Sequence, residues 1–154
     1  MATFDEAELR RRIETVVYAS ASTVDAQARP RVRILHPVWD WATRTVWIGT
    51  NPNGALAAEL AIHPHLALCY LRSSLDPFLT EQVYVDGAIT WIDPHEGWDK
   101  IKSVPPPVGY DPLVSWSSPE DPKFGVLELT PSRIELAALS AAAGWSQSIW
   151  RAGS

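Results

Sequence analysis

The chain has a single cysteine, no long apolar run and no excess of basic residues. Cys69 alone cannot form an internal disulfide or a multi-cysteine metal site. No apolar stretch approaches the roughly 18 residues that a membrane-spanning helix needs, and the N-terminal segment lacks the apolar core of a signal peptide. The net charge of −5 differs from the clustered positive charge of nucleic-acid-binding proteins. We therefore expect a cytoplasmic protein that binds neither membranes nor nucleic acid.

The motifs of several enzyme classes are also missing. The chain has no nucleophile elbow, Walker loop, Rossmann fingerprint or zinc-ligand spacing. His63 and His65 flank Pro64 at the end of an expected helix, where helix capping explains His63 without metal chemistry. A metal site needs further ligands, which the sequence does not assemble. We therefore expect no metal, and we assign no catalytic acid, base or nucleophile.

The composition is that of one globular domain spanning residues 1–154. Hydrophobic residues make up 46% of the chain and charged residues 20%, which are ordinary values for such a domain. Tryptophan and proline are abundant, with eight and thirteen residues. Many of the prolines lie in residues 103–122, a long aperiodic segment of the kind that is usually functional or disordered. Its apolar residues predict that this loop packs against another surface, for which a partner subunit is one candidate.

Three segments show helical periodicity or helix-start signals. The second of them is rich in alanine and leucine, which are strong helix formers. The expected helices and their capping residues are about 4–16 with Thr3, 54–62 with Asn51 or Asn53, and about 94–102 with Asp93.

The remaining regular segments show the alternation and β-branched content of strands, and Gly87 is expected to form a bulge or bend. Residues 73–80 are expected to be a loop. The expected strands are 17–24, 31–35, 45–50, 66–71, 83–92, 124–129 and 132–136, with 145–150 as a further candidate. This pattern predicts a mainly β (α+β) fold, a six- to seven-stranded antiparallel barrel with two to three short helices.

Seven segments in one order carry a family resemblance that extends from about Tyr18 to Trp150. The segments are ARPRVRILHPVWD, VWIGT, LAAELAIHPHLALCYL, EQVYVDGAITWI, DPHEGWDKI, PPPVGYDP and FGVLELTPSRIEL. The series resembles the pyridoxamine-5′-phosphate-oxidase-like family of flavin-binding split β-barrels. The resemblance implies a homodimer that binds FMN in clefts at the subunit interface and acts as an oxidoreductase on a small organic substrate.

The resemblance also implies which residues would hold FMN. Arg31 and Arg33 share a face if the strand alternates strictly. Without the resemblance, their interpretation as solvent-facing residues is favoured over phosphate binding; the resemblance reverses that preference, and the register between the two stays open. The implied assignment is Arg31 or Arg33 at the phosphate, Ile34, Leu35 and His36 beneath the isoalloxazine ring, Gly49 and Thr50 near the ribityl chain, and Gln82 on an interface strand that reaches the flavin.

One departure from the family pattern concerns the phosphate. The family commonly places a lysine, often with an arginine two residues later, in the helix after the third strand. Here those positions are Leu56 and Ala58, and the helix 54–62 has no cation. Three alternatives follow: Arg31 and Arg33 suffice for FMN, the barrel binds a deazaflavin or haem, or it is a non-enzymatic dimer with a vestigial cleft. Authentic pyridoxamine-phosphate oxidase activity is not expected, because the C-terminal region offers few basic residues.

Overall fold

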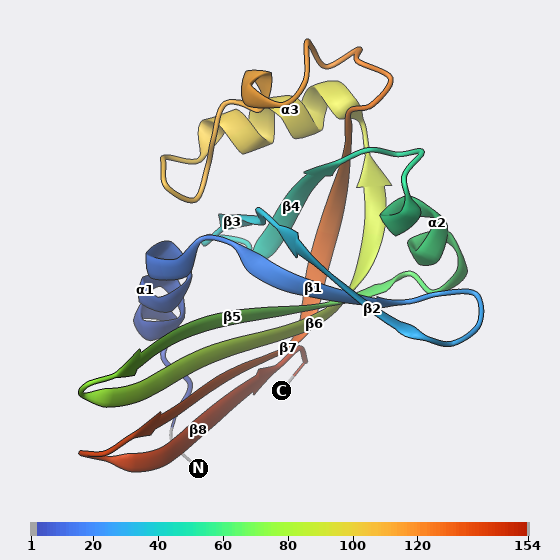
Figure 1. Ribbon diagram of the computed structural model, residues 1–154. Helices are drawn as coiled ribbons and strands as arrows, with labels where there is room; N and C mark the ends of the chain where they lie inside the picture. The colour runs from blue at the N-terminus through green and yellow to red at the C-terminus, as the bar shows by residue number, and fades with distance from the viewer. Residues whose placement is uncertain (1–2, 154) are drawn as a thin grey trace.

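One antiparallel sheet forms the whole framework of the fold. The computed structural model describes residues 3–153 (Figure 1). The sheet has eight strands in the order β2-β1-β5-β6-β7-β4-β3, and β8 pairs with β7. The strands are β1 (Ala19–Val24), β2 (Pro30–Leu35), β3 (Val38–Asp40), β4 (Thr45–Thr50), β5 (His65–Leu75), β6 (Phe78–Ile92), β7 (Gly125–Ser140) and β8 (Gly144–Arg151).

The barrel is split between two strands that are neighbours in the chain. β2 and β3 are separated only by the His36-Pro37 step, yet they form the two ends of the hydrogen-bonded path. The sheet therefore curls around without closing, and β4 and the end of β2 border the split. This architecture confirms the expected mainly β split barrel, with eight strands instead of six or seven.

In the described part of the chain, three helices and one 3-10 turn surround the barrel: α1 (Glu6–Val16), α2 (Ala55–Ile62), α3 (Pro94–Ser103) and η1 (Pro112–Val114). Leu9 and Ile13 of α1 are fully buried, and α1 contacts β5 and β6. α3 and the loop after it gather at one end of the barrel (Figure 1). Within residues 3–153, no helix is long and apolar enough to span a membrane.

Aliphatic and aromatic side chains from all parts of the sheet fill the barrel. Trp39 is fully buried, and its indole Nε1 donates a hydrogen bond to the hydroxyl of Tyr70 at 3.0 Å. This bond satisfies two polar groups that would be costly to bury alone. Large side chains that are almost completely buried include Ile48, Leu66, Leu68, Leu127, Leu129 and Ile134.

Two of the expected helix caps are wrong. The first helix begins at Glu6, and Asp5 caps it by accepting hydrogen bonds from the amides of Ala7 and Glu8 at 2.9 and 3.2 Å. Thr3 therefore lies before the cap. α2 is capped by the backbone of Gly54 without a side-chain bond, whereas Asn51 and Asn53 lie in the preceding turn. The expected Asp93 cap of α3 is confirmed by its bond to Glu96 at 3.0 Å.

Two strand predictions are also wrong, because pairing between distant segments overrides local signals. Residues 73–80 are not a loop: β5 and β6 continue pairing to Leu75 and Phe78, on either side of a turn at Asp76-Pro77. Similarly, β7 runs without a break through Pro131. Pro131 lies opposite Gly87, where the register shifts. The expected irregularity at Gly87 is thus confirmed, and it accommodates a proline that has no N–H to donate.

The proline-rich loop packs against its own barrel. Val108 and Phe124 are almost fully buried, while Tyr110 and Trp116 pack against the core. The rings of Trp116 and Phe124 lie 5.0 Å apart. Val114 stays 77% exposed at the tip of η1. The expectation that this loop packs is confirmed, and the surface it covers is the barrel end near β4.

Candidate functional site

A cleft of about 330 Å³ opens where the end of β2, the middle of β4 and the proline-rich loop meet. We call it the split cleft, because it lies at the open seam of the barrel. Four residues assigned through the family resemblance, Ile34, Leu35, His36 and Gly49, line it together. The complete lining is Tyr18, Ile34, Leu35, His36, Gly49, Tyr110, Val114, Ser115 and Trp116.

His36 ties the loop to the end of β2. Its Nε2 lies 2.9 Å from the carbonyl oxygen of Val108, and its ring lies 4.9 Å from that of Tyr18 and 4.5 Å from that of Tyr110. Partial burial lowers the pKa of His36 below its ordinary value. The imidazole is therefore neutral at pH 7, and its Nε2–H donates to Val108. Its role in the fold is to hold the loop over the split cleft.

Gly49 is a glycine because the loop comes so close to β4. A Cβ added at this position would lie 2.9 Å from the hydroxyl of Tyr110 and 3.0 Å from the Trp116 ring. The indole of Trp116 is itself fixed by a 2.9 Å bond from Nε1 to the carbonyl of Lys123. Burial raises the pKa of Tyr110 to about 12, so this wall of the cleft is aromatic and uncharged.

One residue along β2 from the cleft, Arg33 is bound by a carboxylate of α2. Its guanidinium donates to Glu59 at 2.6 Å and to the hydroxyl of Thr23 at 2.8 Å, and that hydroxyl also bonds Glu59. We call these three residues the Arg33–Glu59 bridge. Glu59 is nearly buried, and its bonds from Thr23 and Arg33 lower its pKa. It is therefore ionised at pH 7, so the bridge carries no net charge.

Arg31 points toward a second carboxylate. Its Nε lies 3.5 Å from an oxygen of Asp25, and its side chain is 57% exposed. Arg31 also contributes to the lowered pKa of Glu59. Both arginines thus approach the same side of the sheet, as strict alternation predicts, but each already faces an acidic partner. The structure favours Arg33 as the residue nearest α2.

α2 contributes no cation to this region. Leu56, at the position where the family commonly has lysine, is 5% exposed and packs in the core. Ala58 is exposed. The one charged residue of α2 is Glu59, which the sequence analysis missed because it searched the helix for cations only. The available signal was a single acidic residue in an otherwise uncharged helical segment.

Two further assigned residues do not line the split cleft. Thr50 is the last residue of β4, opposite Gly125. Gln82 lies on β6 between Leu71 and Ala137, and its backbone carbonyl accepts from Arg12 at 3.1 Å. The structure therefore brings Ile34, Leu35, His36 and Gly49 together and leaves Gln82 apart from them.

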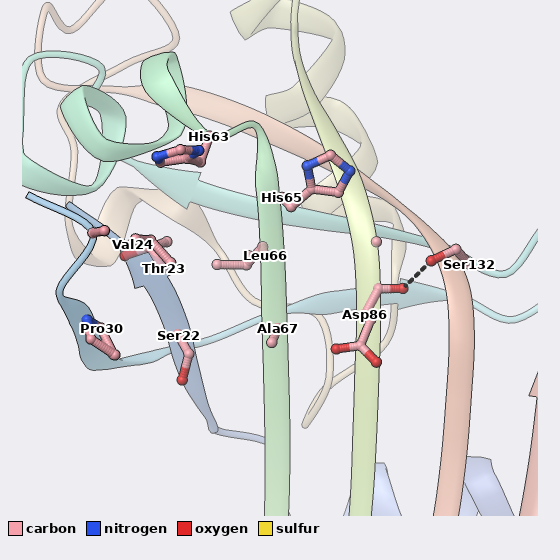
Figure 2. Close-up of a pocket in the computed structure, with 12 residues that line it drawn as sticks. Ser22, Thr23, Val24, Pro30, His63, His65, Leu66, Ala67, Asp86 and Ser132 are labelled. Atoms are coloured by element: carbon pink, nitrogen blue, oxygen red, sulfur yellow. Dashed lines mark hydrogen bonds between the residues drawn. The ribbon is translucent and has the colours of Figure 1, made fainter. Parts of the chain in front are cut away.

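A larger hollow of about 500 Å³ lies on another side of the barrel, between the β1–β2 turn, the end of α2 and β6 (Figure 2). His63 and His65 are turned to opposite sides of the start of β5, and Ser132 donates to the carbonyl of Asp86 at 3.1 Å. Within residues 3–153, no group of three histidine, cysteine or acidic side chains is placed to hold a metal. None of the residues assigned through the resemblance lines this hollow.

With this geometry in view, comparisons with known proteins define the family. The sequence profile of pyridoxamine 5′-phosphate oxidase matches residues 5–138, which is most of the chain. The chain belongs to the pyridoxamine-5′-phosphate-oxidase-like family of split β-barrels. A search of curated proteins found no match.

Solved structures share the fold of this family member at low sequence identity. A pyridoxamine 5′-phosphate oxidase-related, FMN-binding protein from Nostoc punctiforme has a TM-score of 0.59 at 18% identity, covering 98% of both chains. A putative 5-nitroimidazole antibiotic resistance protein from Bacteroides thetaiotaomicron has a TM-score of 0.70 at 12% identity, covering 90% of this chain and 86% of that one. A haem-binding protein from Mycobacterium smegmatis reaches 0.68 at 12% identity, covering 96% of this chain and 59% of that one. At these identities the likeness shows the fold.

Proposed function

We propose that this protein is a flavin-dependent oxidoreductase that acts on a small organic substrate, with the isoalloxazine ring bound in the split cleft. The observation that supports the proposal is the convergence of Ile34, Leu35, His36 and Gly49 on one cleft walled by aromatic side chains. Its volume is within the roughly 300–1,000 Å³ typical of small-molecule sites. A bound flavin would supply the redox chemistry by accepting and donating a hydride, while the protein binds and orients it.

The lining of the split cleft fits a planar aromatic ring. Tyr18, Tyr110 and Trp116 offer apolar faces on which such a ring can stack, and His36 holds the loop that carries two of them. The same geometry gives no support to haem, because the Nε2 of His36, the histidine that lines the cleft, is already bonded to Val108. Flavin is therefore the cofactor class that the cleft supports best.

The phosphate of FMN fits less well. The residues assigned to it, Arg31 and Arg33, each face a carboxylate, and Leu56 offers a buried methyl group where the family commonly has an ammonium. A phosphate bound here would depend on α2 backbone amides alone. The cleft thus fits the ring of FMN and does not fit its phosphate as the side chains are arranged.

We also propose that the protein acts as a homodimer, as the family resemblance implies. β2 is an end strand of the sheet, and it exposes Val32 and Ile34 at 67% and 63%, beside Tyr18 and Val114. Apolar groups gathered at a sheet edge are typical of an association surface. Equilibrium sedimentation is expected to give twice the 17.0 kDa chain mass, and Val32→Glu should shift the protein toward monomer. A monomeric wild-type protein at micromolar concentration would contradict this part of the proposal.

Absorption spectroscopy tests the cofactor. The purified protein is incubated with FMN, riboflavin or a deazaflavin and then desalted. Retained flavin absorbance is expected, and Ile34→Glu should abolish it by placing a carboxylate beneath the ring, since Ile34 is exposed enough to substitute without unfolding the barrel. Leu75→Glu is the matched control, because Leu75 is 89% exposed on the distant β5–β6 turn. Retention of only the deazaflavin would identify a deazaflavin, and not FMN, as the cofactor. Retention of none of the three would refute the enzymatic proposal.

A further inference from the structure

The Arg33–Glu59 bridge is built into the fold and is not a surface ion pair. The side chains of Arg33 and Glu59 are 23% and 11% exposed, and their closest atoms lie 2.6 Å apart. Thr23 is 4% exposed and bonds both partners. The bridge joins three elements, β1, β2 and α2. These hydrogen bonds fix the positions of all three side chains relative to one another.

The position of Glu59 determines what Arg33 can bind. Arg33 has two of its donor groups committed, one to the carboxylate and one to Thr23. A phosphate that approached Arg33 would have to displace the carboxylate or lie next to it. Displacement leaves Glu59 charged and nearly buried without its partner, which is strongly unfavourable. Coexistence places two anions on one guanidinium, and like charges at that distance repel.

No nearby group assigned to the phosphate compensates for this loss. Arg31 faces Asp25 at 3.5 Å, so the two arginines are balanced by two carboxylates. α2 supplies no cation, and its Leu56 is part of the core. A hydroxyl group, by contrast, can donate to a carboxylate and accept from a guanidinium without any change in charge.

We propose that Glu59 disfavours the binding of phosphate at this site. The protein then binds riboflavin, the flavin that ends in a hydroxyl group, at least as tightly as FMN, which ends in a phosphate monoester. The inference rests on the proposed function for the identity of the ring. Its own content is the role of Glu59 as the residue that determines specificity at the tail of the ligand. Glu59 acts through Arg33 and is a positioning residue.

The direct test compares riboflavin with FMN by quenching of flavin fluorescence. Wild-type protein is expected to bind riboflavin as tightly as FMN or more tightly. Glu59→Gln keeps a hydrogen-bonding side chain but removes the charge, so that Arg33 is free to bind phosphate. FMN affinity should then rise at least about tenfold relative to riboflavin, the size of one charge-assisted hydrogen bond. Adding Arg33→Gln to Glu59→Gln should remove the gain.

The chain offers a matched control in a second pair of the same kind. Glu135 on β7 is 12% exposed and bonds Arg133, which is 27% exposed. Glu135→Gln therefore makes the same chemical change in a similarly enclosed pair on β7, a strand that takes no part in the Arg33–Glu59 bridge. It should leave the ratio of FMN to riboflavin affinity unchanged. An equal gain in both variants would show that the effect comes from net charge, and would overturn the proposal.

A second arm needs no flavin. Inorganic phosphate should raise the melting temperature of Glu59→Gln, because a ligand that binds only the folded state stabilises it, and should leave wild-type protein unchanged. If neither flavin binds but phosphate stabilises Glu59→Gln alone, the role of Glu59 stands and the proposed function fails. If wild-type protein binds FMN at least tenfold more tightly than riboflavin, or if Glu59→Gln changes neither ratio nor phosphate response, the inference about Glu59 is refuted. Should Glu59→Gln not fold, the wild-type ratio decides alone.

Discussion

The split cleft and the Arg33–Glu59 bridge involve consecutive residues of β2, Ile34 and Arg33, yet they have opposite chemical character. The cleft is open and walled by neutral aromatic groups. In the bridge, the charged groups of Arg33 and Glu59 are bonded to each other and to Thr23. The split cleft has surface available for a ligand. In the bridge, by contrast, the guanidinium of Arg33 is already paired with the carboxylate of Glu59. One barrel thus places an open aromatic cleft and a charge-balanced ion pair on consecutive residues of the same strand.

The largest expected effect comes from closing the split cleft at Gly49. In Gly49→Ala the new Cβ would lie 2.9 Å from the Tyr110 hydroxyl and 3.0 Å from the Trp116 ring, which is closer than ordinary van der Waals contact. The loop must shift, at a cost of about 1–3 kcal/mol, and flavin binding should be lost. Gly54→Ala, at the N-cap of α2, is the control: the nearest atom is the Asn51 carbonyl oxygen at 3.4 Å, and the cost should be under about 1 kcal/mol. Urea unfolding and hydrogen exchange over residues 104–124 measure both.

Equal destabilisation by Gly49→Ala and Gly54→Ala would contradict this view of the cleft. So would unchanged exchange in the loop of Gly49→Ala, because the loop contacts at Gly49 are the reason given for the effect.

The next effect concerns the bridge. Arg33→Leu leaves Glu59 nearly buried and without its guanidinium. We expect a loss of about 2 kcal/mol, between the values for exposed and fully buried pairs. Arg33→Leu/Glu59→Leu should be more stable than Arg33→Leu, because it removes the uncompensated charge. The free energy of unfolding from urea titration gives the coupling, and additive effects of the two substitutions would show that the bridge does not act as a unit.

Much of the fold was predictable, because the strand signals are local. The segment 83–92 shows an alternation that the burial of β6 follows, and the β-branched segment 45–50 forms β4 as expected. Asp93 starts its helix with a side chain three residues from its partner amide. The hairpin at 73–80 was not predictable in this way. Its residues become strands because β5 and β6 pair over their whole length, and such pairing depends on a register that a single window does not contain.

The candidate site shows the same division. The adjacency of Ile34 and Leu35 to Gly49 followed from the family resemblance, and their convergence on one cleft is seen in the structure. Whether these residues bind a flavin stays a prediction. The contacts of Glu59 were missed, because its partners Thr23 and Arg33 lie on β1 and β2, far from α2 in the sequence. A search for the cations that a phosphate needs does not detect the carboxylate that occupies them.

The smallest expected effect separates the two regions by pH. In the folded protein, burial lowers the pKa of His36 below its ordinary value of 6.5. The unfolded chain therefore binds this proton at a higher pH than the folded chain does, and stability falls as the pH drops below about 6.5. The bonds from Thr23 and Arg33 lower the pKa of Glu59 from 4.5. Its contribution is therefore present above pH 4.5 and is lost only as pH falls below that value. The loop over the split cleft should loosen before the bridge does.

Hydrogen exchange measured from pH 7 to pH 4 resolves the order, once the intrinsic pH dependence of exchange is subtracted. Amides of residues 104–124 should lose protection as the pH falls below 6.5, while those of α2 keep theirs until the pH is below 4.5. His36→Gln retains a hydrogen-bonding side chain and does not titrate, so it should remove the first phase and leave the second. If α2 loosens together with the loop in wild-type protein, the split cleft and the bridge are one cooperative unit, and their different charge states do not separate them in stability.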